Sequence, residues 1–305
     1  MSSYKSVVMQ HFFSDFSGKL PAHELELLLE SAFHRRFPDS PRLNRQMIYS
    51  DDFSSDLDWV TQARIWAEKR LSSRVPIQHL TREQNFFGRY FEVGPEVLIP
   101  RPETEVLMES VLNWLGQENR GVVFGAEIGT GSGIIPITLA LESRSVLQIL
   151  ATELSPEGLR RAQDNANHLG LSPDAITWIK IQDRSDVTST LLQWVERSSK
   201  KLNFLVSNPP YLKQGFGEAE EQVEKFEPAE ALFAPEQDPL FYYRAIAGAA
   251  SSLMEPGGMV FLEIPHERAQ AISELFSIGF ESVRVIPDLT GKSRVLEAKV
   301  GVWTK

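Results

Sequence analysis

The chain has 305 residues, enough for one large domain or two of ordinary size. Hydrophobic residues make up 42% and charged residues 24%, a composition that supports a buried core and excludes a disordered chain. No apolar run approaches the roughly 20 residues of a membrane span. Cysteine is absent, which excludes disulfides, thiolate nucleophiles and cysteine-based metal sites. We expect no signal peptide, because residues 1–16 lack a basic stretch leading into an apolar one, and hence a cytoplasmic location.

The net charge of −10 is unevenly distributed. Residues 1–90 carry 12 Lys and Arg against 11 Asp and Glu, whereas residues 91–305 carry 19 against 30. So acidic a segment gains no general affinity for the phosphates of a nucleic acid. The charge therefore argues against a long nucleic-acid footprint.

The first ninety residues are predicted to be helical. One apolar stripe has the i, i+3, i+4 spacing of a helix face and consists of Leu25, Leu28, Leu29, Ala32 and Phe33. A second stripe consists of Leu57, Val60, Ala67 and Leu71, with Trp59 and Trp66 nearby. We predict a helical N-terminal domain over residues 1–84.

Residues 85–93 form two aromatic-rich runs around a Gly-Arg pair, which predicts a β-hairpin within a linker over residues 85–100. Beyond it, short apolar runs alternate with helical patterns, as in residues 122–129, 147–154 and 202–210. Buried strands that alternate with helices indicate an open, mostly parallel α/β sheet. We assign it to a domain over residues 101–305.

The segment EIGTGSG, residues 127–133, lies where the first of these strands gives way to a helix. Glycines there allow a tight turn and a close approach of backbone to ligand. The spacing is not the G-x-G-x-x-G of dinucleotide sites, and a turn that merely packs explains the motif equally well. Glu153, at the end of the next strand, suits either the two hydroxyls of an adenosine ribose or the start of the following helix. Asp183, after the third strand, suits an adenine amino group but is more typical of a turn.

Asn208-Pro209-Pro210-Tyr211 directly follows the fourth apolar strand. Prolines end strands, so the motif could be a simple turn. In this position, however, the Asn208 amide oxygen and the Pro209 carbonyl could accept the N–H groups of a planar amide or amine, with Tyr211 stacked over it. That arrangement would aim the nitrogen lone pair at an electrophile.

Together these motifs resemble those of class I S-adenosylmethionine-dependent methyltransferases that modify planar nitrogens. Residues 97–106, VLIPRPETEV, narrow the resemblance to the HemK/PrmC family, which methylates the glutamine side chain in the Gly-Gly-Gln motif of peptide chain release factors. The similarity spans roughly residues 74–300 and continues in residues 226–232, 256–264 and 288–298. It implies a Rossmann-like, mostly parallel seven-stranded sheet with a small helical N-terminal domain, residues 1–84, that recognises the substrate.

The resemblance also implies the roles of individual residues. The residues expected to bind S-adenosylmethionine, and to release S-adenosylhomocysteine, are Glu127, Gly129, Thr130, Gly131, Ser132, Gly133, Glu153, Asp183, Arg184 and Asn208. The residues expected to bind the glutamine and support catalysis are Asn208, Pro209, Pro210 and Tyr211, with Arg101 and Glu103 shaping the pocket between the domains. Arg184 stands where family members can carry a tryptophan against the adenine, and Arg101 could instead form a structural salt bridge. No metal site is expected.

The sequence therefore predicts a protein-glutamine methyltransferase whose partner is a release factor. The alternatives are a methyltransferase for a ribosomal-protein glutamine and an adenine-N6 methyltransferase for DNA or RNA, which the acidic charge disfavours. A non-catalytic cofactor-binding protein would leave the Asn-Pro-Pro-Tyr motif without a purpose. An NAD-dependent oxidoreductase lacks the expected glycine spacing.

Overall fold

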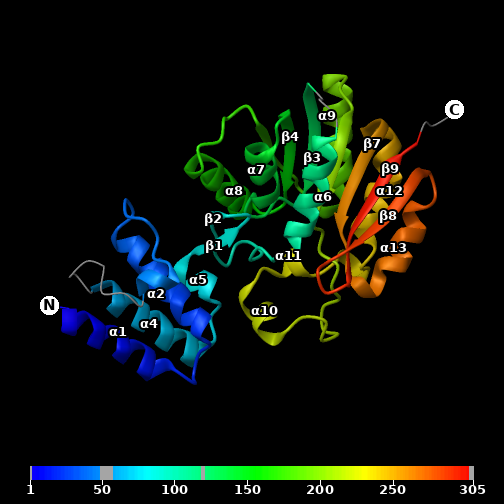
Figure 1. Ribbon diagram of the computed structural model, residues 1–305. Helices are drawn as coiled ribbons and strands as arrows, with labels where there is room; N and C mark the ends of the chain where they lie inside the picture. The colour runs from blue at the N-terminus through cyan, green and yellow to red at the C-terminus, as the bar shows by residue number, and fades with distance from the viewer. Residues whose placement is uncertain (1, 49–57, 118–120, 302–305) are drawn as a thin grey trace. The chain divides into compact units, whose positions relative to one another are not determined.

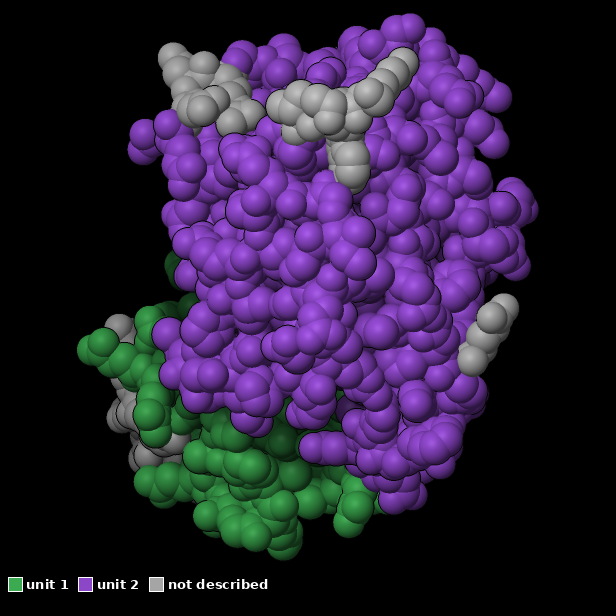
Figure 2. Space-filling view, turned by 90° about the vertical axis from the view of Figure 1, so that its right-hand side faces the viewer, with its two compact units in different colours: residues 1–83 green, residues 84–305 purple. Residues whose placement is uncertain are grey.

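The computed structural model describes residues 2–48, 58–117 and 121–301. The chain divides into two units, residues 1–83 and residues 84–305 (Figure 2). One hydrophobic cluster lies within the first unit and two lie within the second, so the helical segment has a core of its own.

The first unit contains α1 (Ser2–Phe16), α2 (Ala22–Arg36), α3 (Arg45–Ile48), α4 (Asp58–Ser73) and α5 (Ile77–Thr81). The apolar stripe predicted for α2 is buried. In α4 the buried face is formed by Trp59, Val60, Ala63, Trp66 and Ala67. Leu71, predicted to share that face, lies in the last turn and is 37% exposed. Trp59 and Trp66 are buried on this face instead. Leu57, the other predicted member, lies outside the described residues.

The predicted hairpin is present as β1 (Glu83–Phe86) and β2 (Arg89–Glu92). Gly88 between the strands has φ +75°, a conformation that glycine adopts without strain. Phe86 and Phe91 are fully buried and pack in one cluster with α6 (Thr104–Gly116). The hairpin is therefore held by the core of the second unit.

The second unit is built on a seven-stranded sheet (Figure 1). Its strands are β3 (Val122–Ile128), β4 (Val146–Glu153), β5 (Ile176–Lys180), β6 (Leu202–Ser207), β7 (Met254–Glu263), β8 (Phe280–Pro287) and β9 (Ser293–Val300). Their order is β5-β4-β3-β6-β7-β9-β8, and only the pairings of β9 with β7 and β8 are antiparallel. The mostly parallel sheet expected from the sequence is confirmed.

Helices pack on both faces of this sheet. On one face lie α6, α7 (Ile134–Glu142) and α8 (Pro156–His168), and on the other α9 (Val187–Ser198), α12 (Phe241–Leu253) and α13 (Ala269–Phe276). Successive residues of β6 alternate between the two cores: Phe204 and Val206 face the first, Leu205 the second. The short helices α10 (Glu221–Phe226) and α11 (Ala229–Leu232) lie in the connection between β6 and α12. None of the described helices could cross a membrane.

Candidate active site

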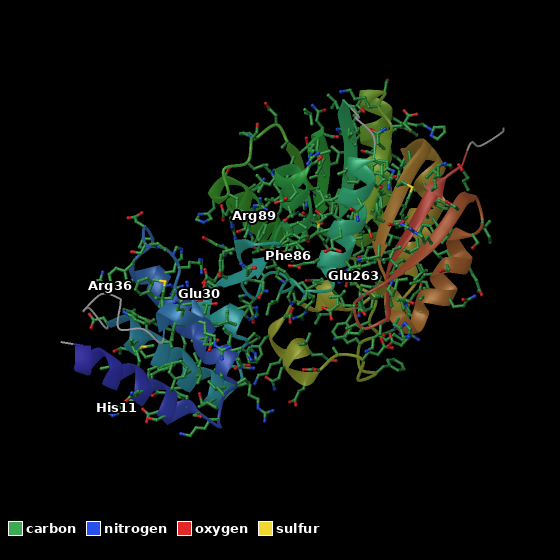
Figure 3. All side chains as sticks on the ribbon, in the orientation of Figure 1. His11, Glu30, Arg36, Phe86, Arg89 and Glu263 are labelled. Atoms are coloured by element: carbon green, nitrogen blue, oxygen red, sulfur yellow. The ribbon has the colours of Figure 1, made fainter. Side chains whose placement is uncertain are left out.

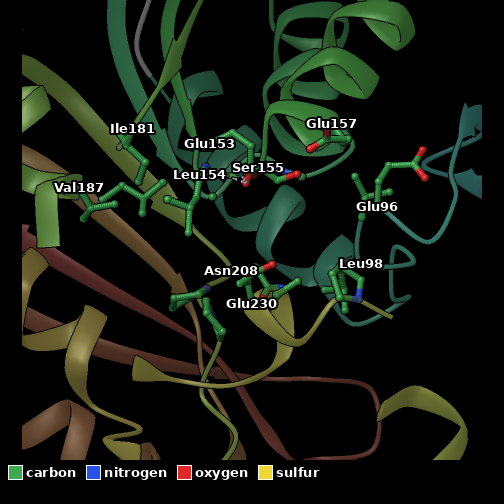
Figure 4. A pocket seen from close by; sticks show the side chains of 18 of the residues that line it. Glu96, Leu98, Glu153, Leu154, Ser155, Glu157, Ile181, Val187, Asn208 and Glu230 are labelled. Carbon is green, nitrogen blue, oxygen red and sulfur yellow. Dashed lines mark hydrogen bonds between the residues drawn. The ribbon is translucent and has the colours of Figure 1, made fainter. Parts of the chain in front are cut away.

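A cavity of about 310 Å³ opens at the carboxyl edge of the sheet. Strands β5, β4, β3 and β6 are parallel neighbours, so the loops that follow them meet at this edge. The loops contribute Ile181, Glu153, Gly129 and Asn208 to the cavity wall. Figure 4 shows Glu153 and Asn208 reaching the cavity from different strand ends. The glycine loop, which ends at Gly133, and the Asn-Pro-Pro-Tyr motif, which begins about 75 residues later at Asn208, are thus brought to one cavity.

The glycine loop gives this cavity part of its floor. Gly129 and Gly131 line the cavity with φ +77° and +53°, and a Cβ built on either one meets nothing within 4 Å. At Gly133, with φ +81°, a Cβ would lie 2.8 Å from Ile137 and 3.0 Å from Ala162. The first two glycines therefore leave room for a ligand, and Gly133 permits α7 and α8 to approach.

Glu127 lies just before this loop and is 1% exposed. Its Oε2 has no hydrogen-bond partner among the described residues, and neither has the hydroxyl of Thr130. Burial raises the pKa of Glu127 to about 8, while the nearby Thr130 hydroxyl lowers it and the charge of Glu153 raises it. A buried, unpartnered carboxyl oxygen beside an open glycine loop fits a ligand that brings an ammonium group.

Glu153 is held by the backbone around it. Its Oε2 accepts a hydrogen bond from Gly131 N–H at 2.8 Å, and its Oε1 accepts from Leu154 N–H at 2.8 Å and Ser155 N–H at 2.9 Å. Each carboxylate oxygen has two lone pairs, so one lone pair on Oε2 is left for a ligand hydroxyl. A one-oxygen contact with a ribose fits this position. The two-oxygen contact expected from the sequence requires Glu153 to release one backbone N–H.

The charged side chains of the cavity wall are all acidic. They are Glu96, Glu153, Glu157 and Glu230, and no lysine, arginine or histidine is found among the described residues that line the cavity. Ser155, also in the cavity wall, caps the N-terminus of α8: its hydroxyl accepts the Gly158 N–H at 3.1 Å. An acidic wall favours a cationic ligand such as a sulfonium with an ammonium group, and disfavours a pyrophosphate.

Asp183 and Arg184 are not in the cavity wall. Asp183 is exposed and accepts hydrogen bonds from the backbone N–H (2.9 Å) and hydroxyl (2.7 Å) of Ser185, which lower its pKa. This is the turn role that the sequence left open for it. Both charges act on Tyr242 of the cavity wall, whose pKa burial raises to about 12. Contact of the two residues with an adenine stays a prediction.

Asn208, Pro209 and Pro210 line the same cavity as the glycine loop, and Ser207 and Ile128, which precede the two segments, are paired in the sheet. Asn208 is half-buried, and its Nδ2 donates a hydrogen bond to Thr104 Oγ1 at 3.3 Å. Thr104 in turn donates to Glu263 Oε2 at 2.8 Å. The Ser207 hydroxyl donates to the Ile128 carbonyl at 2.8 Å, which ties the end of β6 to the end of β3. The motif is thus held in place from both sides.

The three other predicted substrate residues lie outside the cavity wall. Tyr211 packs against the core shared by α9, α12 and α13, and burial raises its pKa to about 12. Arg101 forms an ion pair with the buried Glu227, whose other oxygen accepts the Ile99 N–H at 2.9 Å. Glu103 is the residue that precedes α6. For Arg101 the structure shows the salt bridge that the sequence left as an alternative.

Sequence reasoning assigned no role to Thr104, Glu227, Tyr242 or Glu263. Glu263 is 3% exposed at the end of β7, and burial raises its pKa to about 7. A signal existed for it, because a glutamate inside the apolar run MVFLEI must find a polar partner. Thr104 and Tyr242 have no such local signal.

Comparison with solved structures establishes the fold. The human Mettl16 catalytic domain, solved in complex with an RNA hairpin from the MAT2A 3'UTR, superposes with a TM-score of 0.54 and 17% identity over 95% of this chain and 96% of that one. The human methyltransferase 10 domain containing protein gives 0.51 and 20%, covering 83% and 100%. The sheet order and the cavity at its carboxyl edge define the fold as that of class I S-adenosylmethionine-dependent methyltransferases.

Sequence comparison defines the family. Release factor glutamine methyltransferase of Bacteroides thetaiotaomicron is 36% identical over 231 residues, 75% of this chain and 77% of that protein. The protein of the same name from Bordetella pertussis is 31% identical over 276 residues, 85% and 94% of the two chains. No family model matches the sequence. The chain belongs to the release factor glutamine methyltransferase family.

Proposed function

We propose that this protein transfers a methyl group from S-adenosylmethionine to the side-chain amide nitrogen of the glutamine in the Gly-Gly-Gln motif of a peptide chain release factor. The observation that supports it most is that Asn208, Pro209 and Pro210 line the same cavity as Gly129, Gly131 and Glu153. The residues proposed to bind the cofactor and those proposed to bind the planar amide therefore line one cavity. The substrate is suggested by the names of the relatives.

The residues around the cavity suit the proposed cofactor. Glu127 would accept its ammonium group, the glycine loop would face its methionine end, and Glu153 would accept a ribose hydroxyl. Bound there, S-adenosylmethionine supplies an electrophilic methyl group on a cationic sulfur. The glutamate-rich wall favours that positive charge.

The Asn-Pro-Pro motif would bind and orient the glutamine. The nitrogen of an amide is a poor nucleophile because its lone pair is delocalised into the carbonyl group. Asn208 Oδ1 and the Pro209 carbonyl, each accepting one N–H, would fix the plane of the amide and point its nitrogen into the cavity. Alignment of two reactants can lower a barrier by roughly 7–11 kcal/mol, so positioning supplies much of the proposed catalysis.

The test is an intact-mass measurement on a release factor incubated with the protein and S-adenosylmethionine. The control release factor carries asparagine in place of the Gly-Gly-Gln glutamine. We expect a gain of one methyl group on the first and none on the control. Asn208→Ala should abolish the gain while S-adenosylhomocysteine still protects the protein against thermal unfolding.

The other outcomes separate the alternatives. No gain on the release factor, with S-adenosylhomocysteine still bound, would overturn the proposed substrate and direct the assay to ribosomal-protein glutamine and then to adenine. Methylation of an oligonucleotide would weaken steeply between 50 and 200 mM salt, because nucleic-acid binding depends on phosphate contacts. Protection by a nicotinamide cofactor instead would favour the oxidoreductase.

A further inference from the structure

A buried hydrogen-bond chain joins the end of β7 to the Asn-Pro-Pro motif. Glu263 Oε2 accepts the hydroxyl hydrogen of Thr104 at 2.8 Å, and Thr104 Oγ1 accepts the Nδ2 hydrogen of Asn208 at 3.3 Å. Thr104 is 1% and Glu263 3% exposed. Figure 3 labels Glu263 at this strand end. Its backbone carbonyl accepts the Tyr243 hydroxyl at 2.9 Å, which holds the strand end in place. This series of hydrogen bonds ends at Asn208, which lines the cavity.

The order of donors along this chain is fixed by chemistry. An ionised carboxylate only accepts hydrogen bonds, and a threonine hydroxyl has a single hydrogen to donate. Once Thr104 donates to Glu263, its oxygen can only accept from its other neighbour. While Glu263 is ionised, the side of the Asn208 amide that faces Thr104 must therefore be its NH₂ group, and Oδ1 is turned away from Thr104.

We infer that Thr104 and Glu263 are positioning residues that set the orientation of the Asn208 amide, so that Oδ1 is presented to an N–H of the substrate. A flipped amide would offer NH₂ to the substrate's own NH₂, two donors facing each other. The inference rests on the proposed glutamine methylation for its catalytic consequence. The orientation itself does not depend on any substrate.

The charges around Glu263 come from four elements. Arg101 and Glu103 precede α6, Tyr211 follows β6, Tyr243 lies on α12 and Arg294 on β9. Burial raises the pKa of Glu263 to about 7, while the Thr104 hydrogen bond and Arg294 lower it. Above that pH the carboxylate fixes the order of donors. Below it a protonated Glu263 can donate to Thr104, which frees the threonine hydrogen to point at Asn208.

The activity test compares Thr104→Val, which keeps the shape and removes the hydroxyl, with Thr104→Ser, which keeps the hydroxyl. At pH 8 we expect kcat to fall about ten- to a hundredfold in the valine variant, since misorientation at a reacting centre has effects of this size. The serine variant should retain most of the wild-type kcat. The Kd for S-adenosylhomocysteine should stay within about threefold in both.

The matched control is Thr138→Val, which removes another fully buried threonine hydroxyl, on α7, that has no hydrogen-bond partner in the described structure. Its kcat should equal that of the wild type. A Thr104→Val protein that folds, binds S-adenosylhomocysteine and keeps the wild-type kcat would overturn the inference.

A second measurement needs no substrate. In protein labelled with ¹⁵N at asparagine, the Asn208 side-chain NH₂ signals are identified by their loss in Asn208→Asp. They should shift between pH 6 and pH 8, and the shift should vanish in Thr104→Val and Glu263→Gln. Identical titrations in wild type and variants would overturn the inference. If the shifts behave as expected but no release factor is methylated, the proposed function fails and the positioning role stands.

Discussion

At the scale of single residues, two glycines of one loop meet different demands. Gly131 has φ +53° and open space where a Cβ would stand, whereas a Cβ at Gly133 would lie 2.8 Å from Ile137. Both adopt the left-handed conformation, which costs an alanine about 1–2 kcal/mol. Gly170 has φ +71° and open space outside the cavity wall, and so serves as a control for that backbone cost.

We expect Gly131→Ala and Gly170→Ala to lose about 1–2 kcal/mol of unfolding free energy. Gly133→Ala should lose about 2–4 kcal/mol, because the clash adds to the backbone strain. Gly131→Ala should also weaken S-adenosylhomocysteine binding by about tenfold or more, unlike Gly170→Ala. Urea unfolding and calorimetric titration measure these effects. Equal affinities in the two variants would show that Gly131 does not face the cofactor.

Glu127 predicts how cofactor affinity depends on pH. Its pKa is raised to about 8, so at pH 6 the carboxyl is protonated in the free protein. If it accepts the cofactor's ammonium group, binding must expel that proton. The affinity for S-adenosylhomocysteine should then rise from pH 6 to pH 8, by at most about tenfold per pH unit, and level off above. Glu127→Gln should bind more weakly at pH 8 and lose this dependence. A wild-type affinity that is flat with pH would contradict this role.

The same shift has a consequence for stability. The folded protein retains a proton on Glu127 up to about pH 8, whereas the unfolded chain loses it near the ordinary value of 4.5. Between those pH values the folded state binds the extra proton, so this group's contribution to stability declines as the pH rises. We expect the melting temperature of Glu127→Gln, relative to that of the wild type, to increase from pH 5 to pH 8. A difference that is constant over this range would show that Glu127 is ionised in the fold.

At the scale of elements, α8 connects the glycine loop to the hairpin through one buried side chain. Asn165 Nδ2 donates to the carbonyls of Ser132 (2.8 Å) and Glu92 (3.0 Å), and its Oδ1 accepts the Glu92 N–H at 2.7 Å. The Asn165 side chain is fully buried, and its bond to the Ser132 carbonyl is closed to water. The position of the loop therefore depends on the packing of α8 and β2.

Asn165→Leu should lower the unfolding free energy by about 2–4 kcal/mol, because three backbone groups lose their partner, and the bond to the Ser132 carbonyl is buried. Affinity for S-adenosylhomocysteine should fall as well, since the loop loses its support. Asn167→Leu, at an exposed position of the same helix, should change stability by no more than about 0.5 kcal/mol. Denaturant unfolding of both variants tests this. Similar losses in the two would mean that the helix surface, and not the buried clamp, determines stability.

The sequence predicted those parts of the fold and site that have local signals. Apolar runs predicted β3, β4 and β6, and the motifs at their ends contain Gly129, Gly131, Glu153 and Asn208, which line the cavity, whereas Asp183 and Tyr211 do not. The hydrogen bond between Thr104 and Glu263 joins residues 159 positions apart, and the ion pair of Arg101 with Glu227 joins residues 126 apart. Neither pair has a periodicity or a spacing that marks it. Partners of this kind are determined by strand order and become visible only when the sheet is assembled.

At the scale of the whole molecule, we expect the second unit to bind the cofactor and the first to recognise the release factor. Every described residue of the cavity wall lies between positions 96 and 242, within the second unit. The first unit has its own core, in which Phe12, Leu28 and Trp59 are buried. Cofactor binding should therefore need only the second unit, and the predicted role of the first in recognising the release factor can be tested separately.

A chain of residues 83–305 retains the complete hairpin, the sheet and the cavity. We expect it to bind S-adenosylhomocysteine with a Kd within about threefold of the full chain, because no residue of the wall is removed. Methylation of a release factor should fall steeply, mainly through a higher KM. Calorimetric titration and initial rates measure the two effects, with circular dichroism to verify folding. A folded fragment with undiminished kcat/KM would assign recognition to the second unit, and one that cannot bind S-adenosylhomocysteine would show that the cavity depends on residues 1–82.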